Sequence, residues 1–268
     1  MPTLSRSVPG VLLVALTMIG CDDSSPTSLD TATPSAVVAP AMQSAQSGLT
    51  ASGDTYLEEN RPHKTRGDDP RLRVKGKQAT GRVHRALVRF SDADLVQAVG
   101  ASTVTEATLE VTVTAAQGWG SSGRFVSVHA MSVSWTEAGA TWACADDTDP
   151  ENDLLDCALG DVWSMEGAQP PFDAATDSVR VVNSAAGTTL EFDVTADVQA
   201  FLAGSRVNHG WVIAKTDETA NGDIDLASRT ESGAPVLRIV TETQEVPDVV
   251  PDSVPSELFA DSVMAVGP

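Results

Sequence analysis

Basic side chains are concentrated in one short part of an otherwise acidic chain. The 268 residues carry a formal net charge of −20, yet ten of the 17 Lys and Arg lie between residues 61 and 89, where the only acids are Asp68 and Asp69. The ten are Arg61, Lys64, Arg66, Arg71, Arg73, Lys75, Lys77, Arg82, Arg85 and Arg89. Guanidinium groups bind carboxylates through paired hydrogen bonds, so this segment has the chemistry to bind an anionic polymer such as a uronic-acid polysaccharide.

The spacing of these cations predicts that they share the faces of strands. Side chains alternate between the two faces of an extended chain, so a strand from residue 71 to 77 places four cations on one face: Arg71, Arg73, Lys75 and Lys77. A strand over 84–90 places two more on one face: Arg85 and Arg89. If these strands pair, they form one basic sheet face. The competing interpretation is structural, because cations on the wet face of a sheet also pair with cross-strand acids.

One tryptophan is a candidate for stacking against a sugar ring. Trp119 is flanked by Gly118 and Gly120 in a predicted loop, and we expect it to be the most exposed of the five Trp residues. Aromatic residues of a sandwich more often belong to its core, so the structural interpretation stays open here too.

The first 21 residues predict export. Arg6 precedes an apolar run, Val8 to Ile19, that is too short to span a bilayer and has the layout of a secretion signal. The last four residues, Met18 to Cys21, resemble a bacterial lipobox, which predicts lipidation of Cys21. The protein would then be lipid-anchored in the bacterial cell envelope, with the lipid as its only contact with the membrane. The alternative is an ordinary cleaved signal and an extracellular protein.

Export places the other two cysteines in an oxidising compartment. A disulfide between Cys144 and Cys157 is expected there, closing an acidic loop. Oxygen donors in that loop raise the alternative of a weak calcium site: Asp146, Asp147, Asp149, Glu151 and Asp153. EF-hand spacing is absent, so a solvated acidic loop is favoured, and no other cofactor is expected.

Catalysis has little support in the residue pattern. The four His form no metal or nucleophile motif, and no Gly-rich phosphate loop follows a strand. We therefore expect a protein that is not an enzyme. The acidic net charge also argues against nucleic acid as a partner, because phosphates would be repelled.

Period-two alternation dominates the middle of the chain. In Ala107 to Thr114 every second residue is apolar, which is typical of a strand with one wet face. Similar patterns predict strands near 71–76, 84–90, 125–132, 188–194, 210–215, 223–228 and 235–241. One short helix is predicted at Thr195 to Leu202, with Thr195 as its cap and Gly204 as its stop. The expected fold is an all-β, antiparallel, jelly-roll-like β-sandwich.

Composition predicts the boundaries of this sandwich. Residues 22–50 are rich in Ser, Thr, Pro and Ala and are predicted to be a disordered tether. The sandwich is expected over 51–242, and the acidic, Pro-containing segment 243–268 is predicted to be a tail.

An ordered set of short motifs resembles a known domain. The set is Asp54-Thr55-Tyr56, Asp69 to Val74, Arg85 to Phe90, Ala107-Thr108-Leu109, Trp135-Thr136-Glu137, Thr141-Trp142, Phe192 to Thr195, Ala227-Ser228-Arg229 and Pro235-Val236-Leu237. In number and order these motifs resemble the DNRLRE domain, which is related to carbohydrate-binding module family 96. The resemblance spans about residues 51 to 241 and implies a jelly-roll-like sandwich of bacterial extracellular proteins, some of which bind anionic polysaccharide such as alginate. This chain departs by an extra loop between Trp142 and Trp163.

Two functions are compatible with these observations. The first is a non-catalytic binding module for polysaccharide, expected to be anionic, outside the cell or at its surface. The second is a structural or adhesion protein of the cell envelope that acts through protein–protein contacts. A polysaccharide lyase or hydrolase is a distant third.

Overall fold

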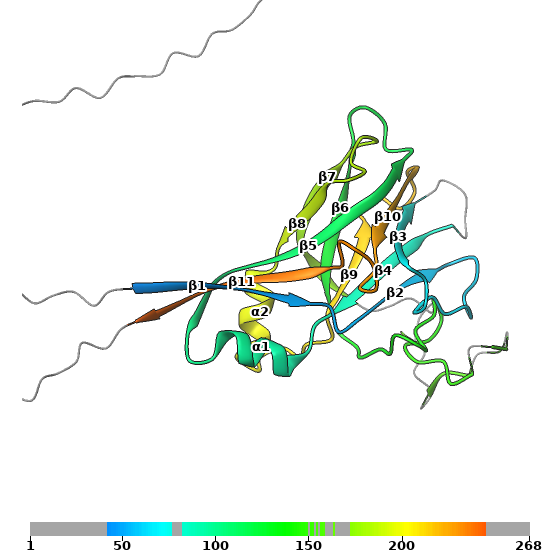
Figure 1. Ribbon diagram of the computed structural model, residues 1–268. Helices are drawn as coiled ribbons and strands as arrows, with labels where there is room; N and C mark the ends of the chain where they lie inside the picture. Colours follow the sequence, from blue (N-terminus) through cyan, green and yellow to red (C-terminus); the bar gives the residue numbers. More distant parts are fainter. Residues whose placement is uncertain are drawn as a thin grey trace, which may run out of the picture. The chain divides into compact units, whose positions relative to one another are not determined.

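The computed structural model describes residues 42–76, 82–149, 151–152, 154, 156–158, 163 and 172–244. They form an all-β, antiparallel sandwich, as the alternation predicts (Figure 1). The strands are β1 Met42–Thr50, β2 Gly53–Glu58, β3 Arg71–Gly76, β4 His84–Arg89, β5 Thr103–Gln117, β6 Arg124–Met131, β7 Phe172–Val181, β8 Thr189–Asp193, β9 Trp211–Lys215, β10 Gly222–Ala227 and β11 Val236–Gln244. The two helices are α1 Asp92–Val99 and α2 Thr195–Leu202.

Strand β5 joins the two halves of the sandwich. The strand order is β1-β11-β5-β10-β3-β4-β9-β6-β7, with β2 added on β4 and β8 on β5. The first part of β5 pairs with β11 and β8, whereas its last residues pair with β10. A 15-residue strand can bend from one layer into the other, so the sheet curls over its own apolar face.

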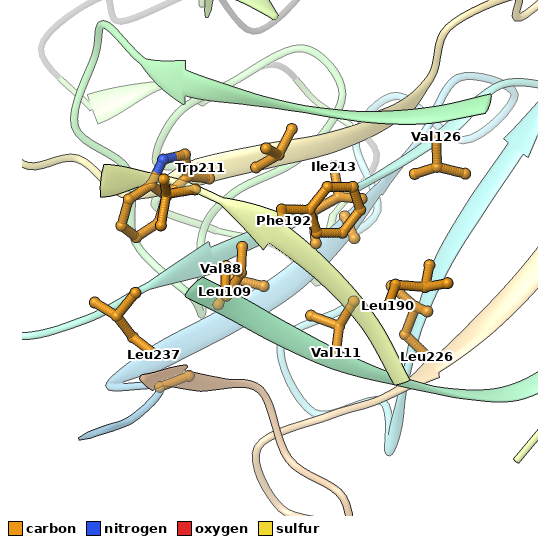
Figure 2. Close-up of a cluster of buried hydrophobic side chains, with 14 of the residues drawn as sticks. Val88, Leu109, Val111, Val126, Leu190, Phe192, Trp211, Ile213, Leu226 and Leu237 are labelled. Carbon is orange, nitrogen blue, oxygen red and sulfur yellow. The ribbon is translucent and has the colours of Figure 1, made fainter. Parts of the chain in front are cut away.

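The core lies where the alternating apolar positions meet. Leu109, Val111 and Val113 of β5 are fully buried, while the residues between them are partly exposed, as period two requires. Phe192 of β8 and Trp211 of β9 fill the space between the layers (Figure 2). Each such side chain contributes about 1.5–3 kcal/mol by leaving water.

A second apolar cluster lies outside this core. Leu57, Leu87 and Val212, from three strands, pack against tryptophans of the segment that follows β6. Those tryptophans are Trp135, Trp142 and Trp163. We call this cluster the outer cluster. It explains why both faces of β2, β4 and β9 are buried.

The predicted disulfide is confirmed. Cys144 and Cys157 are bonded, with their Cα atoms 5.3 Å apart. The bond closes the extra loop whose first residues follow Trp142, and Cys144 itself is fully buried. The loop is therefore fixed beside the outer cluster.

The sequence predicts one helix, and the described residues contain two that lie next to each other (Figure 1). In α2 the expected cap is replaced: the side chain of Asp193 accepts a hydrogen bond from Thr195 N (3.0 Å), and Thr195 Oγ1 accepts one from Ala107 N (2.9 Å). Helix α1 was missed although its signals are present. Ser91 accepts a hydrogen bond from Asp94 N, and Leu95 and Val99 bury one face.

The prediction of a tether up to residue 50 is wrong for its last nine residues. Met42–Thr50 form β1, which pairs along its whole length with β11 (Figure 1). Its side chains are mostly exposed, so no apolar alternation marks it, and backbone hydrogen bonds define it instead. Strand β11 also runs two residues beyond the predicted boundary at 242.

Several predictions lie outside the described residues. They concern the signal at 1–21, lipidation of Cys21, the tether over 22–41 and the tail from 245 to 268. Within the described part of the chain, no helix is long and apolar enough to cross a membrane.

Candidate functional site

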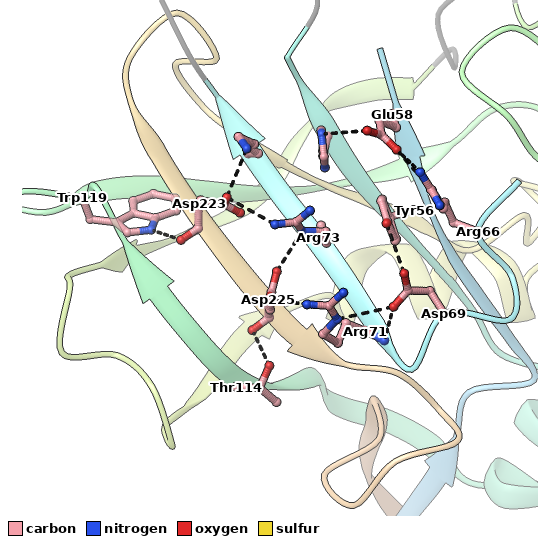
Figure 3. Close-up of polar contacts among 12 residues, drawn as sticks. Tyr56, Glu58, Arg66, Asp69, Arg71, Arg73, Thr114, Trp119, Asp223 and Asp225 are labelled. Carbon is pink, nitrogen blue, oxygen red and sulfur yellow. Dashed lines mark hydrogen bonds and ion pairs between the residues drawn. The ribbon is translucent and has the colours of Figure 1, made fainter. Parts of the chain in front are cut away.

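The predicted basic face of β3 is present, and it is paired with acids. In the antiparallel register Arg73 lies opposite Asp225, and Lys75 lies opposite Asp223. Arg73 Nε is 3.0 Å from Asp225 Oδ1, and Lys75 Nζ is 3.2 Å from Asp223 Oδ2. Arg71 Nη1 adds a contact of 3.3 Å to Asp225 Oδ2. We call these five side chains the β3–β10 ladder (Figure 3).

The ladder is more open at its Arg71 end. The Arg71 side chain is 50% exposed, against 26% for Arg73 and 24% for Lys75. Arg71 Nε also lies 3.5 Å from Asp69 Oδ1. Burial opposes the charge of Arg73, but the adjacent Asp223 and Asp225 outweigh it and raise the pKa of this guanidinium. The cations of the ladder are thus held in fixed positions by carboxylates.

The neighbouring strands β2 and β4 continue the ladder as a network of mostly buried polar side chains (Figure 3). Tyr56 of β2 donates a hydrogen bond to Asp69 Oδ2 (3.2 Å), and Arg66 pairs with Glu58. His84 of β4 stacks on Tyr56 with 5.7 Å between ring centroids. Burial lowers the pKa of His84 to about 4, although Glu58 opposes the shift, so the ring is neutral at pH 7.

Arg85 and Arg89 do not join the ladder, so the expected single basic face is wrong. Within the described residues, β3 and β4 pair at Lys75 and His84 alone, and tryptophans of the outer cluster cover Arg85 and Arg89. Arg85 is 5% exposed and lies over the rings of Trp142 (4.9 Å) and Phe172 (5.2 Å). Arg89 lies over Trp135 (5.1 Å) and donates a hydrogen bond to its carbonyl oxygen (3.0 Å). Lys77 lies outside the described residues.

The prediction that Trp119 is exposed is wrong as well. Its ring is fully buried behind the ladder, and its Nε1 donates to the carbonyl oxygen of Asp223 (2.9 Å; Figure 3). Gly118 and Gly120 have φ of +73° and +74°, a conformation that lets the loop turn the ring inward. Lys215 lies over this ring at 5.4 Å. Trp119 therefore supports the ladder instead of offering a surface to a ligand.

A surface groove that no sequence pattern predicts lies beside Arg85, away from the ladder. It has a volume of about 550 Å³ and is bordered by β6, β7, β9 and the turn after β9. We call it the β6–β9 groove. Its lining is Arg85, Ser127, His129, Phe172, Ala175, Ala214, Lys215, Thr216, Asp217, Glu218 and Thr219. Four strands, β4, β6, β7 and β9, and the turn after β9 contribute to it, so no local spacing could have identified it.

Carboxylates of the acidic loop accept hydrogen bonds from neighbouring residues of the protein. Asp146 Oδ1 accepts a hydrogen bond from Thr136 Oγ1 (2.5 Å), and Asp147 Oδ1 accepts one from Asp149 N (3.1 Å). No group of three or more His, Cys, Asp or Glu in the described residues is arranged to hold a metal ion. Of the predicted calcium ligands, Glu151 belongs to the described residues and Asp153 does not.

Comparison with known proteins adds one relation. No curated protein matches the chain. The model of carbohydrate-binding module family 96 matches residues 45–153. This range contains β3 and β4 with their arginines, and it ends before β10, which supplies the acids of the ladder. This match relates residues 45–153 of the chain to carbohydrate-binding module family 96, and it supports a carbohydrate-binding module as the general class of the protein.

Proposed function

We propose that the protein is a non-catalytic module that binds anionic polysaccharide at the β3–β10 ladder. The observation that carries this proposal is a row of three cations on one strand, Arg71, Arg73 and Lys75, held in place by cross-strand carboxylates. Alternate residues of a strand are about 7 Å apart, so the row presents positive charge at regular intervals to an extended chain.

The open end of the ladder is where a ligand carboxylate would bind first. A guanidinium carries five N–H donors in a planar fork. Among the described residues, the carboxylate contacts of Arg71 use Nε and Nη1, and half of its side chain faces water. A carboxylate of the polysaccharide can therefore share Arg71 with Asp225, while Arg73 and Lys75 continue the positive row.

The acids of the ladder also have a role in this proposal. The protein carries a net charge of −20, which repels an anionic polymer at long range. Salt confines this repulsion to about 8–10 Å at physiological ionic strength, so the ligand is recognised by short-range contacts with preorganised cations. Asp223 and Asp225 hold the side chains of Arg73 and Lys75 and reduce the entropy lost when the ligand binds.

Affinity electrophoresis tests the ladder. Native gels containing alginate or polygalacturonate, run at low and moderate salt, should retard the wild-type protein, and a variant with Arg71→Gln and Arg73→Gln should lose at least tenfold in affinity. The matched control is Arg238→Gln, because Arg238 is also an exposed arginine paired with an acid, Glu110, but lies on β11. Absence of retardation at low salt, or equal losses in the ladder variant and the control, would contradict the proposal.

We further propose that the module is exported and held at the cell envelope by a lipid on Cys21. The signal-like segment before Cys21 supports this, and so does the disulfide between Cys144 and Cys157, since such bonds persist in oxidising compartments. Detergent phase partitioning of the protein expressed in a bacterium tests the anchor. The wild type should enter the detergent phase, and Cys21→Ala should move to the aqueous phase. A Cys21→Ala variant that stays in the detergent phase would rule the anchor out.

A further inference from the structure

We propose that the β6–β9 groove is a second carbohydrate site, and that it takes a neutral sugar. It lies on the opposite side of β4 from the ladder and is built by other elements, so it does not depend on the ladder being a site. The ligand class follows from the rings, the hydrogen-bonding groups and the charges that border the hollow.

Aromatic rings form one border of the groove. Phe172 at the start of β7 and His129 of β6 are in contact, with 4.7 Å between their ring centroids. His129 is held in place at both nitrogens: Nε2 lies 2.8 Å from Ser127 Oγ, and Nδ1 lies 3.0 Å from the carbonyl oxygen of Asp173. A fixed ring pair at the edge of a hollow suits the apolar C–H face of a pyranose, because that face packs on aromatic rings.

Hydrogen-bonding groups also line the groove. Arg85 donates to both oxygens of Glu218, with Nε–Oε1 of 2.7 Å and Nη2–Oε2 of 2.9 Å. Each carboxylate oxygen has two lone pairs, so Glu218 can accept further hydrogen bonds from sugar hydroxyls. The hydroxyls of Thr216 and Thr219 and the carboxylate of Asp217 stand beside it. Such vicinal donors and acceptors match the hydroxyl pairs of a hexose.

The floor of the groove leaves room for a ligand because its residues are small. Ala214 of β9 and Ala175 of β7 line it together with Ser127. Their side chains leave a volume of about 550 Å³, which falls in the range of sites that bind small molecules. A sugar unit can therefore lie on these small residues and contact both the rings and the hydrogen-bonding groups that line the groove.

The exposed charge of the groove disfavours a uronate. Arg85 is paired with Glu218, and only 6% of its side chain is exposed, against 50% for Arg71 of the ladder. Lys215 is buried, and its ammonium donates to the carbonyl oxygens of Asp217 (2.9 Å), Asn221 (3.0 Å) and Ala220. The carboxylate of Asp217 is exposed, and its hydrogen bond from Thr219 lowers its pKa, so it is ionised at neutral pH. A ligand carboxylate would meet negative charge here, whereas neutral hydroxyls would find acceptors.

The rigidity of the turn supports a site of this kind. Lys215 fastens residues 217 to 221 to β9 through its three backbone acceptors. Arg85 holds Glu218 from the other side while its guanidinium lies over Trp142 and Phe172. The turn and the side chains of Arg85 and Glu218 are thus held in place before a ligand binds, which lowers the entropy cost of binding.

Titration with neutral oligosaccharides tests the groove. The probes are cellohexaose, laminarihexaose and mannohexaose, with an alginate hexasaccharide of the same length as the charged comparison. Calorimetry on the full chain should detect binding of at least one neutral probe, with tryptophan fluorescence changing because Trp142 adjoins Arg85. Absence of binding for all three neutral probes would overturn the proposal.

Variants assign any such binding to the groove. Phe172→Ala should weaken the neutral probe at least tenfold. Because Phe172 also packs against other side chains, Asp217→Asn is the second variant: its side chain is exposed, and we expect a loss of at least threefold with unchanged stability. Affinity for the neutral probe that is unchanged in Asp217→Asn and in a folded Phe172→Ala would overturn the assignment.

The two sites are separated by a crossed design. The variant with Arg71→Gln and Arg73→Gln should keep its affinity for the neutral probe, and Asp217→Asn should keep its affinity for alginate. Loss of both ligands in the ladder variant would show that the groove is not a separate site. Failure of alginate binding alone would contradict the ladder and leave the groove supported.

Discussion

Arg85 and Glu218 form a bidentate ion pair that joins the outer cluster to the turn after β9. The guanidinium of Arg85 donates two hydrogen bonds to the Glu218 carboxylate, at 2.7 and 2.9 Å, and its plane lies over Trp142. Because the Arg85 side chain is 6% exposed and that of Glu218 is 24% exposed, the pair is only weakly screened by water. Because of this geometry, the pair should contribute more to the free energy of unfolding than the surface ion pairs of the protein do.

Replacement of Arg85 should destabilise the fold. Arg85→Met removes both hydrogen bonds and leaves the partly buried Glu218 carboxylate without its cation, which should cost about 3 kcal/mol of unfolding free energy. Urea denaturation measures this. Arg238→Met is the control, because the Arg238–Glu110 pair is similarly two-pronged but exposed, and little change is expected. Equal effects of the two substitutions would mean that burial does not distinguish the pairs.

Asp54 should make stability fall as pH rises. Burial raises the pKa of Asp54 to about 6, although hydrogen bonds from Arg229 N (2.6 Å) and Ser228 Oγ (3.3 Å) oppose the shift, and the nearby Glu137 adds to it. The folded state therefore binds the proton more tightly than the unfolded chain does. The resulting stabilisation is present below pH of about 4 and is lost as the pH rises through about 6.

The measurement is the unfolding free energy of the wild type minus that of Asp54→Asn across this range. The difference should fall by about 3 kcal/mol between pH 4 and pH 6 and stay level above, since one pKa unit corresponds to about 1.4 kcal/mol. A difference that rises with pH would show that Asp54 is stabilised in its charged form, contrary to the effect of burial.

His84 should act in the opposite direction. Burial lowers its pKa to about 4, against the attraction of Glu58, while Arg73 and Lys75 reinforce the shift and Asp223 opposes it. The unfolded chain then binds the proton more tightly. The stabilisation contributed by neutral His84 is present above pH of about 6.5 and is lost as the pH falls through about 4. The wild-type minus His84→Gln difference in unfolding free energy should rise by about 3 kcal/mol over this window. A flat difference would indicate that water reaches the ring.

Removal of the disulfide should weaken the extra loop without abolishing ladder binding. Cys144 and Cys157 are 13 residues apart in sequence, and opening a loop of this size should cost about 3 kcal/mol. Urea denaturation gives the unfolding free energy of a variant with Cys144→Ser and Cys157→Ser and of the wild type. Alginate retardation of both proteins is then measured without urea at 25 °C. Because the ladder lies on β3 and β10, its affinity should change less than twofold. A tenfold loss would show that the loop supports the anionic site.

Sequence alone was sufficient where the determining contacts are local. The alternation from Ala107 to Val113 identifies a strand and its buried face, because period two is a property of the extended backbone itself. The same rule correctly places Arg71, Arg73 and Lys75 on one face of β3, opposite the buried Leu72 and Val74. It cannot show what lies beside that face.

The content of the two candidate sites was decided by the tertiary structure. Asp225 lies about 150 residues after Arg73 in the chain, and only the order of strands in the sheet brings them together. The same holds for Arg85: its alternation with Ala86 is local, but the curl of the sheet and the cover of Trp142 determine that it faces a groove and not the ladder. Strand β1 exists because β11 offers it backbone partners, which no side-chain pattern records. Local spacing thus determines which residues share a face, whereas the strand order determines which distant residues meet across it, since cross-strand neighbours have no fixed separation in sequence.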